Sequence, residues 1–266
     1  MDPVSLVTKK FVYDGDNYVG TVEFWDFRHA FEDIPYTVSL VASTSTATRK
    51  IKDPVKLYEK LIELGHESPF EFISYYDEAR GRRVTYREDQ KFFERLHFIP
   101  DFYDSKIFTF RLRVPIFVAR QIMRHRAFSY MELSRRYVTD KRAPLKFYIP
   151  SVSGFKKILY KGFYSMAARL YRYLIKHKVP AEEARLILSV SLFTEFWMQG
   201  DYKAWANFLL YRLHPSAQKE TRLTAKVIWD ILKKYGFDNL IIKYLTEFAS
   251  RDSLFQDARK RYLANI

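Results

Sequence analysis

The chain has 266 residues, a formal net charge of +14 and no cysteine, and aromatic residues make up 18% of it. The missing cysteine excludes disulfides, zinc–thiolate sites, iron–sulfur clusters and thiol nucleophiles, and it fits a reducing, cytoplasmic setting. A chain this long and this aromatic can bury a full core without disulfides or a metal, and we expect no metal site.

Targeting signals are missing from the sequence. No apolar run approaches the ~18 residues that a membrane span needs, and the N-terminal MDPVSLVTKK lacks the apolar core of a signal peptide. We therefore expect no membrane association. Only four Asn and five Gln accompany 45 Lys+Arg and 31 Asp+Glu. Few thermolabile amides and many charges indicate a thermophilic source.

The N-terminal part predicts short strands and then one helix. Residues 10–46 are rich in Val, Tyr, Phe and Thr and are interrupted by DGDN, which predicts strands joined by a turn. Asp53 and Pro54 read as an N-cap and a first-turn proline, and Gly65 ends the helix that they open. We expect the following HESPFEF to form a loop.

The middle of the chain predicts an irregular excursion and then a strand that leads into a helix. Residues 73–104 are charged and aromatic, with room for one short helix. Residues 107–114 alternate between apolar and polar side chains, which predicts a half-buried strand. Pro115 then opens a helix over IFVARQIM, on which Gln121 and Arg124 share a face.

The remaining sequence predicts mainly helices, over about 154–178, from Pro180, from the N-cap Asp201, and over about 216–235. Strands come first and helices later, so the predicted class is α+β, with a small N-terminal sheet and a mostly helical C-terminal half. No linker or internal repeat interrupts the chain. We therefore expect residues 1–266 to form a single domain.

The segment RHRAFSYMELSRRY, residues 124–137, lies in the densest basic window: residues 111–142 hold nine Lys/Arg and two acids. Arginine forks suit phosphate oxygens, so a phosphorylated ligand is one interpretation. A solvated charged face is a second, and a nucleic-acid patch with stacking aromatic residues is a third. There is no GxGxxG, P-loop, HExxH or GxSxG. A nucleotide would therefore bind outside those frameworks.

The same segment resembles the signature RHRxxSxNExSxRY of the flavin-dependent thymidylate synthases. The matching positions are Arg124, His125, Arg126, Ser129, Glu132, Ser134, Arg136 and Tyr137. GHESPFEF at 65–72 and PIFVARQ at 115–121 resemble two further family segments. The spacing of the family's C-terminal pattern is similar for ARLIL at 184–188, Thr194, Asn207, Phe208, Leu209 and Arg212. The resemblance covers roughly residues 40–72 and 105–230, and it makes residues 73–104 an insertion.

The resemblance implies an enzyme that binds FAD and makes dTMP from dUMP, with methylenetetrahydrofolate as carbon donor and NADPH as reductant. It also implies a homotetramer whose active sites lie at subunit interfaces. Arg212 would be catalytic, because a cation beside the uracil stabilises negative charge as N3 ionises. The implied FAD contacts are Ser45, Ser68, Arg124, His125, Arg126, Glu132, Asp201, Lys203 and Asn207. The implied dUMP contacts are Gln121, Arg124, Glu132, Leu133, Ser134, Arg135, Arg136, Arg185 and Arg212.

Four positions depart from the family pattern. Met131 replaces an asparagine and cannot supply its hydrogen bonds. Asp201 stands where the family usually has asparagine, Lys203 where it has arginine, and Arg135 where it often has a glycine that tolerates φ > 0. These departures leave two alternatives open. One is a divergent member that binds FAD and nucleotide but has lost or altered the reaction. The other is an arginine-rich nucleic-acid-binding protein, although we expect no nucleic-acid partner.

Overall fold

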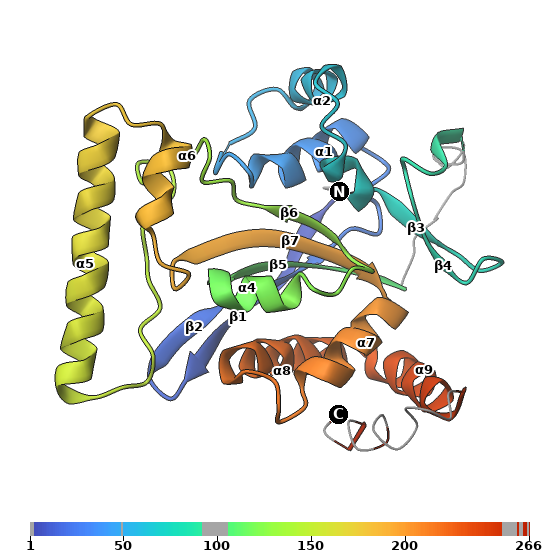
Figure 1. The fold of residues 1–266 in the computed structure, drawn as a ribbon. Helices are drawn as coiled ribbons and strands as arrows, with labels where there is room; N and C mark the ends of the chain where they lie inside the picture. The colour runs from blue at the N-terminus through green and yellow to red at the C-terminus, as the bar shows by residue number, and fades with distance from the viewer. Residues whose placement is uncertain (1–2, 49, 92–105, 252–259, 261–262, 265) are drawn as a thin grey trace.

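A five-stranded antiparallel sheet forms the centre of the structure, with strand order β1-β2-β5-β7-β6 (Figure 1). The computed structural model describes residues 3–48, 50–91, 106–251, 260, 263–264 and 266. The sheet strands are β1 (Ser5–Asp14), β2 (Asn17–Asp26), β5 (Ile107–Pro115), β6 (Ser129–Glu132) and β7 (Phe193–Asp201). A separate hairpin consists of β3 (Ser74–Asp77) and β4 (Arg82–Thr85).

Helices cover both faces of this sheet. The α-helices are α1 (Ile34–Ser43), α2 (Pro54–Glu63), α4 (Ile116–Ile122), α5 (Gly154–Lys176), α6 (Ala181–Ala184), α7 (Tyr202–Arg212), α8 (Lys219–Lys234) and α9 (Asp238–Arg251). Two 3-10 helices are η1 (Ser68–Phe72) and η2 (Arg185–Ile187). None of the helices in the described ranges has the length and apolar character needed to cross a membrane.

The two faces of the sheet carry different side chains because strand residues alternate in direction. On one face, Phe108, Phe110 and Leu112 of β5 pack in the main core with residues of α7 and α8. The opposite face carries Arg111 and the fully buried Trp197, and α1 and η1 cover part of it. In Figure 1, α1 and α2 lie above the sheet, the β3–β4 hairpin lies to its right, α7, α8 and α9 lie below it, and α5 stands at the left.

Several predicted elements are confirmed together with their local causes. Gly15 adopts φ +57 in the turn between β1 and β2, a conformation that glycine reaches without a Cβ penalty. The side chain of Asp53 accepts from the backbone N–H of Lys56 and so caps α2. Asp201 caps α7 in the same way by accepting from the N–H of Ala204. The helices predicted over 154–178, from Pro180 and over 216–235 correspond to α5, α6 and α8, and the α+β class is confirmed.

Three predictions in the first half of the chain are wrong. Residues 34–43 form α1 instead of a strand, because Asp33 caps the helix and the residues at Val38, Val41 and Ala42 bury one helical face. HESPFEF contains η1 instead of a loop. The helix after Pro115 ends at Ile122, so Arg124 lies in the following turn and does not share a helical face with Gln121.

β7 is the largest correction, because residues 193–201 fall in the half that was predicted to be mostly helical. The strand lies between β5 and β6 and pairs with both along its length. Its sequence, FTEFWMQGD, is rich in aromatic residues, which favour strands. The sheet therefore draws one of its inner strands from the C-terminal half of the chain.

The predicted insertion 73–104 begins with the β3–β4 hairpin, which was not predicted. Its later part, residues 92–104, lies outside the described residues, as does residue 105. That segment, including any short helix within it, therefore stays a prediction.

Candidate active site

The short strand β6 divides the candidate site into two sides. Side chains alternate across a strand, and here Met131 and Glu132 line two different cavities. Glu132 faces a cavity of about 640 Å³, which we call the Glu132 cavity. Met131 faces a second cavity of about 880 Å³, which we call the Met131 cavity.

The Glu132 cavity gathers many of the predicted nucleotide-binding residues from distant parts of the sequence. Leu133, Ser134 and Arg135 follow β6 directly, whereas Arg185 comes from η2. All of them line this one cavity, as Arg120 of α4 also does. The cavity thus combines a carboxylate, a hydroxyl and three guanidinium groups, a set that can bind a phosphorylated polar ligand.

The carboxylate of Glu132 is half-buried beside hydroxyl and cationic groups. Burial raises its pKa, while a hydrogen bond from Thr194 and the charge of Arg120 oppose that rise. The Thr194 Oγ1 donates to Glu132 Oε1 at 2.6 Å. Because Thr194 lies on β7, the strand that was not predicted, sequence reasoning did not assign this partner. It also missed Arg120, although Arg120 is part of the quoted PIFVARQ segment.

Arg212 forms a second group with His125 and Gln121 at the end of α4. The Nε of Arg212 donates to Nε2 of His125 at 2.9 Å, and its Nη2 donates to the backbone carbonyl of Gln121 at 2.8 Å. Thr221 donates in turn to the Oε1 of Gln121 at 3.0 Å. These contacts hold the guanidinium of Arg212 in place at the last turn of α7.

His125 is neutral at physiological pH. Burial, and then the positive charge of Arg212, lower its pKa from 6.5 to about 4. Because Nε2 accepts from Arg212, the proton of the neutral ring lies on Nδ1. The hydroxyl of Tyr130 donates to the carbonyls of Ile122 and His125 and so fixes the turn that carries the ring. The neutral histidine leaves the charge of Arg212 uncompensated.

The Met131 cavity receives two of the predicted FAD contacts. Ser45, just after α1, and Ser68 of η1 both line it. Met131 stands among them where the family has asparagine, and it packs against the buried cluster that contains Trp197. The thioether therefore contributes apolar contact on this side of β6 rather than a hydrogen bond.

The side chains of Asp201 and Lys203 form hydrogen bonds to the β3–β4 hairpin. Asp201 Oδ2 accepts from the backbone N–H of Arg83 at 3.2 Å, and Lys203 Nζ donates to the carbonyl of Gly81 at 2.6 Å. Two of the positions that depart from the family pattern therefore attach the β3–β4 hairpin to the start of α7. This contact was not predicted from the sequence.

Arg83 anchors the same hairpin to the sheet. Its Nη1 donates to Gln199 Oε1 at 3.1 Å and its Nη2 donates to Ser129 Oγ at 2.7 Å. Ser129 Oγ donates to Glu71 Oε2 at 2.7 Å. Burial lowers the pKa of Arg83, and the nearby carboxylates of Asp201 and Glu71 oppose that shift. The guanidinium thus replaces water as the partner of buried polar atoms on β6 and β7.

The remaining predicted contact residues differ in how exposed they are. Arg124 and Arg126 lie exposed in the turn after α4. Arg136 pairs with Glu182 of α6 at 3.3 Å, and Arg185 donates to the backbone carbonyl of the same glutamate. Asn207 of α7 has a buried Oδ1 without a hydrogen-bond partner among the described residues.

The predicted residues therefore fall into separate groups within one chain. The Glu132 cavity, the Arg212 group, the Met131 cavity and the hairpin contacts do not merge into one site.

Arg135 has no positive φ, consistent with the loss of the family glycine, and its side chain is buried.

Comparisons with known proteins identify the family. Residues 104–235 match the family model described as thymidylate synthase complementing protein. The flavin-dependent thymidylate synthase of Thermotoga neapolitana is 32% identical over 197 residues, covering 70% of this chain and 74% of that protein. The enzyme of the same name from Pseudothermotoga lettingae is 30% identical over 190 residues, covering 67% and 70%. One from Thermus thermophilus is 34% identical over 173 residues, covering 56% and 62%. The chain belongs to the flavin-dependent thymidylate synthase family, and it is an enzyme.

Because His125 is neutral in the folded protein, the free energy of unfolding should depend on pH. Its folded pKa of about 4 lies below the ordinary 6.5, so the unfolded chain takes up this proton first as pH falls. The contribution to stability is complete above pH 6.5 and is lost as pH falls from 6.5 towards 4. His125→Gln can still accept from Arg212 but does not titrate. We expect its unfolding free energy to fall less than that of the wild type between pH 7 and 4.5, measured by denaturant unfolding. Parallel curves for the two proteins would contradict the assignment.

The anchoring role of Arg83 predicts a second measurable effect. Arg83→Met removes the cationic donor to Ser129 and Gln199, and an unsatisfied buried group typically costs ~1–3 kcal/mol. We expect a loss of that size in the free energy of unfolding and faster tryptic cleavage in the hairpin.

Arg82→Met is the matched control for that change. Arg82 belongs to the same strand but makes an exposed ion pair with Glu88, which is worth ~0–1 kcal/mol. Equal losses in the two variants would show that the hairpin does not depend on Arg83.

Proposed function

We propose that the chain converts dUMP to dTMP by reductive methylation, with FAD as its flavin, methylenetetrahydrofolate as carbon donor and NADPH as reductant. The observation that carries the proposal is the Glu132 cavity, where Glu132, Leu133, Ser134, Arg135 and Arg185 converge. Its volume of about 640 Å³ lies within the range of small-molecule sites.

A nucleoside monophosphate suits the chemistry of this cavity. The guanidinium of Arg185 and the hydroxyl of Ser134 can bind phosphate oxygens, and Arg136 lies nearby because Glu182 contacts both Arg136 and Arg185. Glu132 can accept a hydrogen bond from a sugar hydroxyl or a base N–H while it also accepts one from Thr194. Cations at one end and a carboxylate at the other would orient the nucleotide.

Part of the predicted cofactor set fits a flavin nucleotide. The buried Oδ1 of Asn207 lacks a donor among the described residues, and an amide or hydroxyl of the cofactor would supply one. Arg124 and Arg126 offer exposed cations for its phosphates. Asp201 and Lys203 fit less well, because they are engaged by the hairpin. When bound, the flavin supplies the hydride chemistry that no side chain can provide.

Arg212 is proposed as the catalytic cation. Removing a proton from uracil N3 creates negative charge that a fixed guanidinium stabilises without reorganisation. The contacts to His125 and Gln121 provide that fixation. Because His125 is neutral, it orients the arginine and does not cancel its charge.

A homotetramer is proposed as the working assembly. α5 exposes an apolar stripe to solvent, with Phe155 71% and Met166 57% exposed. Large exposed apolar patches on a protein surface mark interaction sites. A second copy of the chain is the proposed occupant, because the predicted ligand contacts of one chain do not share a cavity and would need residues from a neighbouring subunit to complete a site.

The catalytic proposal predicts that Arg212→Ala keeps bound flavin but makes dTMP more slowly. Loss of one such donor typically lowers turnover roughly 10²–10³-fold. Arg212→Lys should recover only part of the rate, because a point charge lacks the guanidinium fork. Purified variants would be assayed for flavin absorbance, NADPH-driven flavin reduction and dTMP formation. Lys226→Ala, an exposed change on α8, serves as control. Normal dTMP formation by Arg212→Ala would refute the role.

The assembly proposal predicts that Met166→Glu, which places a charge in the apolar stripe, reduces the mass measured by light scattering at micromolar concentration. Ser165→Glu adds the same charge at the neighbouring exposed position and should leave the tetramer intact. A monomeric wild type, or identical behaviour of the two variants, would exclude this interface.

A further inference from the structure

A third cavity, of about 310 Å³, lies on the sheet face that α1 only partly covers. Four arginines line it, and we call it the arginine cleft: Arg111 and Arg113 of β5, Arg135 after β6, and Arg142. The threonines Thr44 and Thr48 after α1 add hydroxyl groups to its wall. Arginines from three separate segments of the chain thus converge on one cleft.

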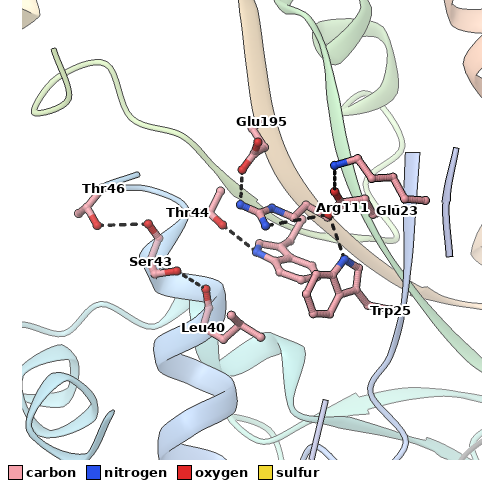
Figure 2. Close-up of polar contacts among 10 residues, drawn as sticks. Glu23, Trp25, Leu40, Ser43, Thr44, Thr46, Arg111 and Glu195 are labelled. Atoms are coloured by element: carbon pink, nitrogen blue, oxygen red, sulfur yellow. Dashed lines mark hydrogen bonds and ion pairs between the residues drawn. The ribbon is translucent and has the colours of Figure 1, made fainter. Parts of the chain in front are cut away.

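The charges of the arginine cleft are not balanced by the protein. Glu195 is the one carboxylate among its lining residues in the described part of the chain, and Arg111 already pairs with it. Figure 2 shows the guanidinium of Arg111 between Glu195 and Glu23, the latter 4.0 Å away. Within the described residues, no carboxylate pairs directly with Arg113 or Arg142. The cleft therefore carries a net positive charge.

Two buried donors in the same cleft lack acceptors. The Nε atoms of Arg111 and Arg135 are buried without a hydrogen-bond partner in the described structure. Arg135 is only 8% exposed, and its other nitrogens donate to the carbonyls of Ala143 and Pro144. Burial is the main cause that lowers the pKa of Arg135, and the positive charge of Arg113 lowers it further, while Tyr171 and Asp140 oppose the shift. Cations that repel one another in this way are stabilised by an oxyanion bound between them.

We infer that the arginine cleft is a binding site for the phosphate or diphosphate group of a small molecule, distinct from the Glu132 cavity. A phosphate offers several acceptor oxygens and the negative charge that these guanidinium groups lack. A volume of about 310 Å³ admits such a group but excludes a nucleic-acid helix. The two cavities adjoin and share Leu133, Arg135, Phe193 and Thr194. Arg113 and Arg142 line only the cleft, and Arg185 lines only the Glu132 cavity.

This division of residues makes the test selective. Binding of inorganic pyrophosphate to the full-length protein would be measured by calorimetry for the wild type and for Arg142→Ala, Arg113→Gln and Arg185→Ala. Saturating dUMP would be present throughout, so that the Glu132 cavity is already filled. We expect Arg142→Ala and Arg113→Gln to weaken pyrophosphate binding roughly tenfold or more, as loss of a charged hydrogen bond does. Arg185→Ala should retain the wild-type affinity, and Arg142→Ala should bind dUMP as the wild type does.

Several results would overturn the inference. These are no pyrophosphate binding by the wild type, loss of binding in Arg185→Ala with full binding in Arg142→Ala, or an equal loss of dUMP and pyrophosphate in Arg142→Ala. Arg142 is exposed in a turn, so this variant keeps the test valid even if the strand variant Arg113→Gln does not fold. The dUMP measurement separates failure of this inference from failure of the proposed synthase activity.

Discussion

The antiparallel pairing of β6 with β7 is the constraint on which the rest of the candidate site depends. It sets Ser129 opposite Gln199 and Glu132 opposite Phe196. In this register the arginine-rich segment leaves the sheet beside α6 and η2, where Arg185 can meet Ser134. A slip of one residue would exchange the sides of Met131 and Glu132, and the carboxylate would then face the Met131 cavity.

On each side of the β6–β7 pair a guanidinium group is held by a different set of polar partners. On one side, the neutral ring of His125 supports the charged Arg212. On the other, the cation of Arg83 satisfies several polar atoms at once. Both arrangements fix a guanidinium through several hydrogen bonds, which costs less side-chain entropy per contact than a mobile lysine would. Part of the positive charge of the chain therefore lies inside the protein, and not all of it lies on the solvated surface.

Sequence reasoning succeeded where the signals are local. The N-caps Asp53 and Asp201 and the turn at Gly15 depend on a few neighbouring residues, and all three are found. It failed where tertiary contacts decide: α1 is rich in Val and Ser, yet it is helical because one face is buried. β7 could not be separated from a helix because its aromatic run is buried on both faces and shows no clear alternation. Consequently Thr194 on β7 was not predicted as the partner of Glu132. The partners of Asp201 and Lys203 were not predicted because they lie in the β3–β4 hairpin, which was also missed.

The way in which the hairpin is attached limits how the chain can be shortened. A deletion joining residue 73 to residue 106 would remove Arg83 and Gly81 together. Ser129 and Gln199, both almost fully buried, would lose the guanidinium, and Lys203 would lose its carbonyl partner. An engineered minimal version of this enzyme would therefore need compensating changes in β6, β7 and α7, because the β3–β4 hairpin and the central sheet share one hydrogen-bond network.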